Sequence, residues 1–222
     1  DMITMLPTKT EVCYNSLFLK ANEAISLKIK DEDYFFGIMS GGSFIRGNND
    51  KRFNNLFETA KTFGKDAELI KDIHSEIPTK SIVYIYTGDI DTNITYFESA
   101  KKITENLDNI RAIFNAAAGN GYKIIITADH GFVTVPKKNP LTPSLKNALS
   151  KKSRYEIVSA NEKTEKGYRL LELEKIGIQS DESLKIVFPI GIRRFSGISG
   201  SKMLYDHGGI SLQEVIIPCF IF

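Results

Sequence analysis

Two short stretches of the chain place a histidine between an aspartate and a glycine. Asp129-His130-Gly131 ends an apolar run, and Asp206-His207-Gly208-Gly209 repeats this order shortly before the final apolar segment. An adjacent carboxylate and imidazole can both reach one divalent ion where the backbone turns sharply, and glycine allows such a turn. Each motif alone also fits an ordinary turn. Taken together, the two motifs fit a shared metal site that contains His130 and His207 as well as they fit two ordinary turns.

A second source of oxygen ligands follows another predicted strand. Gly88-Asp89-Ile90-Asp91 comes directly after a short run of β-branched and aromatic residues. Ligands bind at the carboxyl ends of strands in open α/β sheets, so Asp89 and Asp91 could supply hard oxygen ligands on the same side of the sheet as Asp129. The alternative is that these aspartates cap the following helix.

A hydroxyl group with a possible chemical role begins the first predicted helix. Leu6-Pro7-Thr8-Lys9-Thr10 leads into this helix. The helix dipole and free backbone N–H groups at such a position suit both phosphate binding and a metal-activated alkoxide nucleophile, although Thr10 is also a good N-cap. Arg193 and Arg194 could contact phosphate in a bidentate manner. Solvated surface arginines explain that pair equally well.

The elements expected to position these residues alternate between helix and strand. Helical spacing of apolar residues predicts helices at Glu11–Ala21, Asn49–Phe63, Asp66–Ile77 and Thr95–Ala118, and β-branched runs predict strands at Ser81–Tyr86, Tyr122–Ala128 and Val215–Phe222. The glycine-rich segment between the first two helices, Gly37–Asp50, is interpreted as a loop. Strand, helix and strand joined by short glycine turns are typical of a parallel crossover unit. We therefore predict an α/β fold with a mostly parallel sheet covered by helices.

The pattern changes after Phe132. Pro136–Lys152 is rich in lysine and proline and is interpreted as a surface excursion. Four short segments with β-like composition follow, at Arg154–Ala160, Tyr168–Leu173, Leu184–Ile190 and Gly191–Phe195. We expect residues 136–195 to form a surface excursion and a small antiparallel β subregion within a single domain that spans 1–222. Pro218 predicts an edge or an end of the last strand.

Composition narrows the class of protein. Lysine plus arginine (29) nearly balances aspartate plus glutamate (27), and the net charge of +2 gives no electrostatic footprint for nucleic acid or an acidic membrane. Cys13 and Cys219 lack metal-ligand spacing and suggest no disulfide framework. Since neither a bilayer-spanning run nor a signal peptide is evident, we expect a soluble cytoplasmic protein with no membrane partner. The chain does not begin with methionine, which leaves open that it is part of a longer product.

Four motifs, taken in order, resemble the PglZ domain, a branch of the alkaline phosphatase superfamily. They are MLPTKT at 5–10, YTGDID at 86–91, ITADHGF at 126–132 and YDHGGISLQEVIIP at 205–218. The last two are the most specific, and KSRYEIV at 152–158 is similar in a weaker way. The resemblance extends from Pro7 to Pro218 and implies an α/β core like that of alkaline phosphatase.

The resemblance also implies a chemistry. Members of the superfamily use two divalent metals, usually zinc or manganese, and a serine or threonine nucleophile to hydrolyse or transfer phosphate esters. By this resemblance Thr10 would be the nucleophile, and Asp129 with His130 would hold the metal that activates it. Asp91 and His207 would hold the second metal. Two such ions would stabilise the attacking and leaving oxygens of an in-line displacement.

Two departures from the superfamily pattern bear on activity. The superfamily usually supplies another metal-binding aspartate from a strand before the nucleophile, but only Asp1 precedes Thr10 here. Four residues after Asp91, where a histidine or aspartate is expected, the sequence has Thr95. Asp89 is a candidate to replace that ligand.

Three functions follow from the resemblance. The leading one is a zinc- or manganese-dependent phosphohydrolase, a phosphodiesterase or nucleotide phosphatase acting on a phosphate ester in a bacterial phage-defence or signalling system. PglZ proteins are associated with such defence. The alternative is a catalytically impaired scaffold or binding module that engages other proteins of a larger defence complex. A mutase or sulfatase of the same superfamily is the third.

Overall fold

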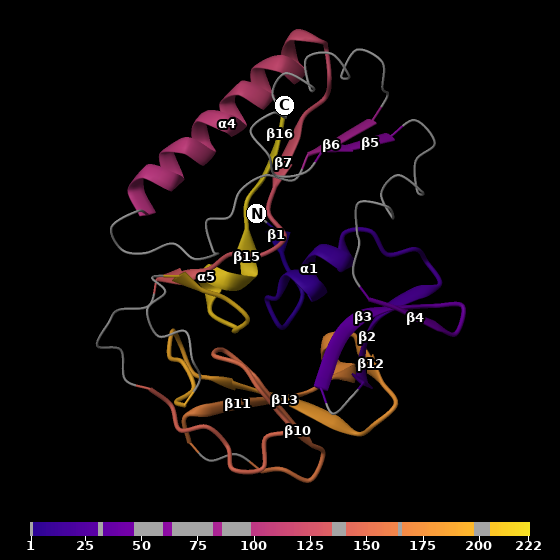
Figure 1. Cartoon of the computed structure of the whole chain (residues 1–222), viewed down its shortest axis with the longest axis vertical. Coiled ribbons are helices and arrows are strands. Elements are labelled where there is room, and N and C mark those ends of the chain that lie inside the picture. Colours follow the sequence, from indigo (N-terminus) through magenta and orange to yellow (C-terminus); the bar gives the residue numbers. More distant parts are fainter. Residues whose placement is uncertain are drawn as a thin grey trace. The chain divides into compact units, whose positions relative to one another are not determined.

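The computed structural model describes residues 2–30, 33–46, 60–63, 82–85, 99–134, 141–163, 166–197 and 205–222. The chain divides into two compact units, each made of two separate segments (Figure 1). Unit 1 is Asp1–Gly47 with Ala128–Ile217, and unit 2 is Asn48–Thr127 with Pro218–Phe222. The expectation of a single domain over 1–222 stays a prediction.

Unit 1 contains a four-stranded sheet that the sequence analysis largely missed. Its strands, in spatial order, are β12 (Ile178–Ser180), β2 (Glu23–Lys30), β3 (Asp33–Ser40) and β4 (Ser43–Ile45). The segment interpreted as a loop, Gly37–Asp50, therefore supplies the end of β3 and all of β4. Gly41 and Gly42 turn the chain between these strands with φ of 54° and 81°, values that other residues rarely adopt. The missed signal was the alternation of apolar and polar residues in EAISLKIK, which is typical of a strand.

A second four-stranded sheet lies within residues 136–195, where the sequence predicted an antiparallel subregion. Its order is β11 (Tyr168–Glu172), β13 (Leu184–Pro189), β10 (Glu156–Ser159) and β9 (Ser150–Lys151), and all its pairings are antiparallel. The segment Gly191–Phe195, predicted as a further strand, makes only an isolated bridge from Phe195 to Thr142.

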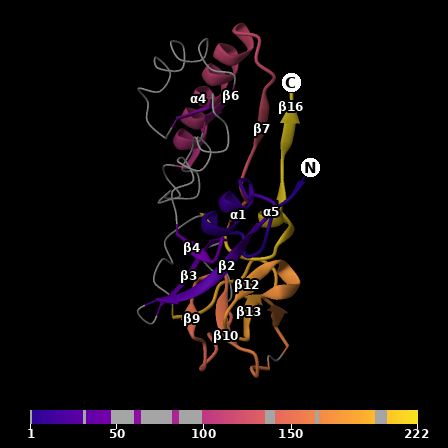
Figure 2. The ribbon, with the colours of Figure 1, turned by 90° about the vertical axis from the view of Figure 1, so that its right-hand side faces the viewer.

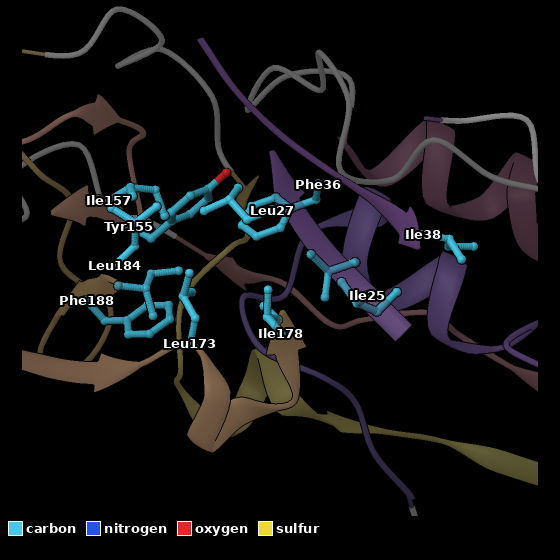
Figure 3. Packing of buried hydrophobic residues seen from close by; sticks show 12 residues of the cluster. Ile25, Leu27, Phe36, Ile38, Tyr155, Ile157, Leu173, Ile178, Leu184 and Phe188 are labelled. Atoms are coloured by element: carbon cyan, nitrogen blue, oxygen red, sulfur yellow. The ribbon is translucent and has the colours of Figure 1, made fainter. Parts of the chain in front are cut away.

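Both sheets of unit 1 contribute to one apolar core. Ile25 and Leu27 of the first sheet pack in the same buried cluster as Ile157, Ile186 and Phe188 of the second, and each of these side chains is at most 1% exposed (Figure 3). The predicted antiparallel β subregion thus supplies a large part of the core.

Unit 1 also contains several short elements, some of which carry or adjoin the residues of the candidate site. They are β1 (Met2–Ile3), α1 (Thr10–Ser16), β8 (Val133–Thr134), the 3-10 helix η2 (Glu174–Ile176), β14 (Tyr205–Asp206), α5 (Leu212–Val215) and β15 (Ile216–Ile217). β1 pairs with β15 and β8 pairs with β14, in both cases antiparallel. These pairings bring the two ends of the sequence and its middle into one small region.

Unit 2 contains one long helix, α4 (Ser99–Gly119), and four short strands in the described ranges. These are β5 (Ala60–Phe63), β6 (Ile82–Ile85), β7 (Ile125–Thr127) and β16 (Cys219–Ile221). β7 and β16 run side by side in both views (Figures 1 and 2), paired antiparallel through Ile126 and Phe220. The helix predicted at 95–118 and the strand predicted at 81–86 are confirmed where the structure describes them, and the strand predicted at 122–128 is shorter, at 125–127. Residues 60–63 form a strand and not the end of a helix, and the remainder of both helices predicted between 49 and 77 lies outside the described residues.

The described strands do not form the mostly parallel sheet that the sequence predicted. Of ten strand pairings, eight are antiparallel, and only β12 with β2 and β5 with β6 are parallel. The prediction relied on a crossover from β6 through α4 to β7, but β7 pairs with the C-terminal β16. A β-branched run indicates a strand without indicating its partner, which explains the difference. Pro218 separates β15 from β16, as predicted.

Helix α4 is buried on one side and exposed on another. Leu107 on one side is 56% exposed, whereas Ala116 on another is 5% exposed. In the described ranges, no helix combines the length and the apolar character needed to cross a bilayer.

Candidate functional site

Four of the residues selected from the sequence lie together in unit 1. Oγ1 of Thr10 is 3.1 Å from Nε2 of His130, and Oδ2 of Asp129 is 3.5 Å from the same nitrogen. The rings of His130 and His207 stack, with centroids 4.2 Å apart and planes inclined by 14°. The structure thereby brings a hydroxyl, a carboxylate and two imidazoles into one site.

Thr10 is the first residue of helix α1 and not its N-cap. Lys9 occupies the cap position with an extended backbone and makes no capping hydrogen bond through its side chain. The helix ends at Ser16, five residues before the predicted end at Ala21. Because the hydroxyl of Thr10 does not cap the helix, it can face His130.

Both imidazoles are held through their Nδ1 atoms. Nδ1 of His130 lies 2.9 Å from the carbonyl oxygen of Gly131, and Nδ1 of His207 lies 2.8 Å from that of Thr8. A carbonyl oxygen only accepts hydrogen bonds, so Nδ1 must carry the proton in each ring. In a neutral ring Nε2 then bears the lone pair. Histidines that bind metals are commonly oriented in this way by a backbone carbonyl.

The carboxylate of Asp129 has an acceptor that no described residue satisfies. Its side chain is 15% exposed, and within the described part of the chain no hydrogen-bond donor reaches the buried Oδ2. Oδ2 lies 3.5 Å from His130 Nε2. A cation near both atoms would satisfy this buried oxygen. A carboxylate oxygen and an imidazole nitrogen are ligands that zinc accepts, so these residues fit a divalent cation.

The described residues do not complete a metal site by themselves. Among them, no three histidine, cysteine, aspartate or glutamate side chains are grouped so that they could hold one ion. Asp91 and its possible substitute Asp89 lie outside the described residues, as do Asp1 and Thr95. The assignment of Asp91 as a ligand stays a prediction.

Glu214 connects the two histidine-bearing loops. Its main-chain oxygen accepts a hydrogen bond from the N–H of Gly131 at 2.9 Å, and its Oε1 accepts one from the N–H of Gly209 at 2.8 Å. Arg154 donates to the same carboxylate through Nε at 3.1 Å and Nη2 at 2.6 Å, and both side chains are 0% exposed. Burial alone would raise the pKa of Glu214, but the hydrogen bonds and charge of Arg154 lower this pKa below its ordinary value. The ionised carboxylate therefore fixes the loop of Gly209, and the main-chain oxygen of the same residue fixes the loop of Gly131.

The glycines beside the histidines serve two different purposes. A Cβ on Gly131 would overlap the main-chain oxygen of Gln213, and one on Gly209 would overlap the guanidinium of Arg154. Only Gly208 has a positive φ, of 108°. The freedom to turn predicted for Gly131 is therefore not the reason for its glycine: Gly131 is required because the segment that contains helix α5 passes so close.

Asp206 supports His207 from the preceding position. Its Oδ1 accepts hydrogen bonds from the backbone N–H of His207 at 2.9 Å and from the hydroxyl of Ser153 at 3.1 Å. Its Oδ2 pairs with Nε of Arg194 at 2.6 Å. Arg194, considered above as a phosphate contact, is 8% exposed and forms an ion pair that anchors the loop before His207.

Cys13 lies one helical turn after Thr10 but does not belong to the group formed by Thr10, Asp129, His130 and His207. It is 0% exposed, and its Sγ lies 3.3 Å from the carbonyl oxygen of Met5. Burial raises the pKa of the Cys13 thiol to about 12, and the negative charge of Asp129 acts in the same direction. Cys13 therefore stays a neutral thiol near pH 7.

The sequence analysis identified the histidines but not the residues that hold them. Ser211 and Glu214 have the S-x-x-E spacing typical of a capping box, and the Glu214 carboxylate accepts hydrogen bonds from the N–H and hydroxyl of Ser211 at 3.1 Å and 2.7 Å. This signal was available in the sequence. The pairing of Glu214 with Arg154, 60 positions away, had no local signal.

Comparison with known proteins relates the whole chain to one family. A family model described as "BREX system PglZ alkaline phosphatase-like domain" matches residues 1–222. The "Alkaline phosphatase-like protein PglZ" of Bacillus cereus (strain H3081.97) is 28% identical over 154 residues, which cover 64% of this chain and 18% of that protein. The chain therefore spans less than a fifth of the length of this relative.

One solved structure shows a partial similarity. It is phosphonoacetate hydrolase from Sinorhizobium meliloti 1021 in complex with phosphonoacetate, with a TM-score of 0.47 and 12% sequence identity. The match covers 70% of this chain and 50% of the hydrolase.

Proposed function

Because the chain belongs to the PglZ family of alkaline phosphatase-like domains, we propose that it is a metal-dependent phosphohydrolase in which Thr10 is the nucleophile. The observation that carries this proposal is the meeting of the Thr10 hydroxyl with His130 and Asp129, beside the stacked ring of His207. In both rings Nδ1 is bonded to a backbone carbonyl, which leaves Nε2 as the ligand atom.

The residues have separate roles in this proposal. Oγ1 of Thr10 forms a bond to phosphorus while the ester P–O bond breaks and the leaving oxygen takes a proton; water then hydrolyses the phosphothreonine. Asp129 and His130 would hold one divalent ion, and Asp91 and His207 a second. When bound, such ions neutralise charge on the phosphoryl oxygens and favour the ionised threonine hydroxyl. Zinc fits imidazole and carboxylate ligands best, with manganese second.

The substrate class and biological role are proposed from the family. We extend the activity to phosphodiesters or nucleotides in a bacterial phage-defence or signalling system, and the support is the family description, which names the BREX system. Other proteins of that system are the expected partners. A cytoplasmic location belongs to the same proposal.

The test compares hydrolysis of bis(4-nitrophenyl) phosphate, with zinc or manganese added, by the wild-type chain and three variants. Thr10→Ala should lose activity on the order of 1000-fold or more, because no other residue replaces the attacking oxygen. Thr10→Ser should keep part of the activity. Thr142→Val is the control, since Thr142 is buried and its hydroxyl has no hydrogen-bond partner in the described part of the chain. Equal activity in Thr10→Ala and wild type would refute the nucleophile.

A scaffold without turnover is the second candidate, and one observation favours it. Thr95 stands four residues after Asp91, where the superfamily usually has a metal-binding histidine or aspartate. On this alternative the wild-type chain would hydrolyse neither phosphodiesters nor phosphate monoesters, with either metal, while binding other proteins of the defence system. Metal-dependent hydrolysis that disappears in Thr10→Ala would exclude it.

A further inference from the structure

Thr8 is a buried polar residue two positions before Thr10, and the proposed function gives it no role. It is 0% exposed. Its hydroxyl accepts a hydrogen bond from the N–H of Gly208 at 2.8 Å and donates one to the carbonyl oxygen of Gly209 at 3.1 Å. Its own carbonyl oxygen accepts the proton of His207 Nδ1 at 2.8 Å. Thr8 therefore bonds to each of three consecutive residues in the second histidine loop.

This arrangement uses chemical properties that few side chains combine. The partners are about 200 positions away in sequence, so the bonds fix tertiary structure and not a local turn. The hydroxyl must both accept and donate, which a threonine or serine can do and a valine of the same shape cannot. Gly208 has a φ of 108°, and a glycine backbone has little conformational preference of its own. Contacts from other parts of the chain must therefore hold this loop.

We propose that Thr8 is a positioning residue that prepares His207 to bind a divalent cation. The hydroxyl fixes the loop, and the fixed loop keeps His207 Nδ1 against the Thr8 carbonyl. The proton then stays on Nδ1, and Nε2 keeps its lone pair beside the stacked ring of His130. That the ligand is a divalent cation rests on the proposed function. The hydrogen bonds that hold the His207 ring do not depend on that proposal.

Removing only the hydroxyl gives the sharpest variant. Thr8→Val keeps the shape of the side chain but leaves the Gly208 N–H and the Gly209 carbonyl without their partner. Zinc affinity, measured by competition with a chromophoric chelator, should fall by about 10- to 100-fold, as is usual when a group that orients a metal ligand is lost. Thr8→Ser restores both hydrogen bonds and should bind within a few-fold of wild type.

A matched control separates positioning from a general loss of structure. Thr142→Val makes the same change at another buried position of unit 1, where the hydroxyl has no hydrogen-bond partner among the described residues. Its zinc affinity should equal that of wild type. An equal loss in Thr142→Val and Thr8→Val would assign the effect to packing and overturn the proposal.

A metal-free measurement keeps the inference independent of the enzyme activity. Nitrogen-15 NMR of the imidazoles should show the wild-type His207 ring protonated at Nδ1. In Thr8→Val the two tautomers should mix and the amide of Gly208 should exchange faster, while Thr8→Ser should resemble wild type. A wild-type ring protonated at Nε2 would overturn the proposal without any variant, even if Thr8→Val did not fold.

The two measurements distinguish the possible failures. If wild type binds zinc and Thr8→Val binds it equally well, Thr8 does not position the ligand and the proposal is wrong. If wild type binds neither zinc nor manganese, the proposed function fails, and the tautomer in wild type and Thr8→Val decides whether Thr8 holds the ring.

Discussion

Gly131 shows how a single missing side chain sets the spacing of the site. Its N–H binds the main-chain oxygen of Glu214, and a Cβ would overlap the oxygen of Gln213. We expect Gly131→Ala to lower the free energy of unfolding by about 1–3 kcal/mol, because the segment carrying helix α5 must move to make room. Urea denaturation at equilibrium measures this loss.

Gly119 supplies the control for that substitution. It is the last residue of helix α4, and a Cβ there would meet nothing within 4 Å. Gly119→Ala should therefore leave the stability unchanged or raise it by up to about 1 kcal/mol. If both variants were equally stable, close approach at Gly131 would not be the reason for its glycine.

The two cysteines should differ in reactivity. Cys13 is fully buried and its pKa is raised to about 12, whereas Cys219 is partly exposed. Near pH 8, a maleimide should label Cys219 alone in the native protein and both thiols after denaturation. In the variant Cys219→Ser, rapid labelling of the native protein would contradict the burial of Cys13.

The raised pKa of Cys13 also fixes the sign of a pH effect. The folded protein holds the thiol proton more tightly than the unfolded chain does, whose thiol has the ordinary pKa of 9.0. The contribution of Cys13 to stability is therefore complete below pH 9.0 and is lost as the pH rises toward about 12.

At the scale of elements, neutralising two fully buried glutamates should destabilise the protein to very different extents. The carboxylate of Glu214 accepts two hydrogen bonds from Arg154 and others from the backbone. In Glu214→Gln the NH₂ group of the new amide would point at these donors, and the buried charge of Arg154 would lose its partner. Its expected cost is about 3–5 kcal/mol. Glu156 binds the hydroxyl of Ser144 and the N–H of Leu145, and both can be satisfied by glutamine. Its expected cost is below about 1 kcal/mol.

The pH dependence of unfolding distinguishes these two acids. Burial raises the pKa of Glu156, so acidification from about pH 7 toward its ordinary value of 4.5 restores stability at this position. At Glu214 the balance favours the charge of Arg154 and lowers the pKa, so stability falls as the pH drops below 4.5. Urea titrations across this range should show the first trend missing in Glu156→Gln and the second missing in Glu214→Gln. The same profile in both variants would contradict the assignment.

Local sequence patterns predicted the elements that have a clear hydrophobic periodicity or a marked β-like composition. Helix α4 and strands β10, β11 and β13 were expected close to where they occur. Strand β2 and the first half of β3 were missed because residues 22–36 received no prediction despite the alternation in EAISLKIK, and the rest of β3 and all of β4 were missed because Gly41 and Gly42 were interpreted as part of a loop. The glycines marked a tight turn between strands and not a long loop.

At the scale of the whole molecule, the sequence motifs selected residues that lie together, whereas the sequence did not predict the strand pairing around them. The motifs contain Thr10, Asp129, His130 and His207, and the structure brings these four together. The residues that hold them, such as Thr8 and Glu214, act through bonds to partners far along the sequence, and only the capping box left a local trace. Strand partners are likewise set by long-range packing, so the direction of the sheet pairings could not be read from composition.

Metal binding should be visible as stability of unit 1, because Asp129, His130 and His207 all lie in its second segment. An ion that binds only the native state stabilises it by about 2.7 kcal/mol at 100 times its dissociation constant. Adding zinc at that level should raise the unfolding midpoint of wild type and of Thr142→Val, and a chelator should reverse the rise. His130→Ala and His207→Ala should lose it, because each removes a ligand. An unchanged rise in both histidine variants would place the zinc elsewhere and remove the basis for a hydrolytic site at Thr10.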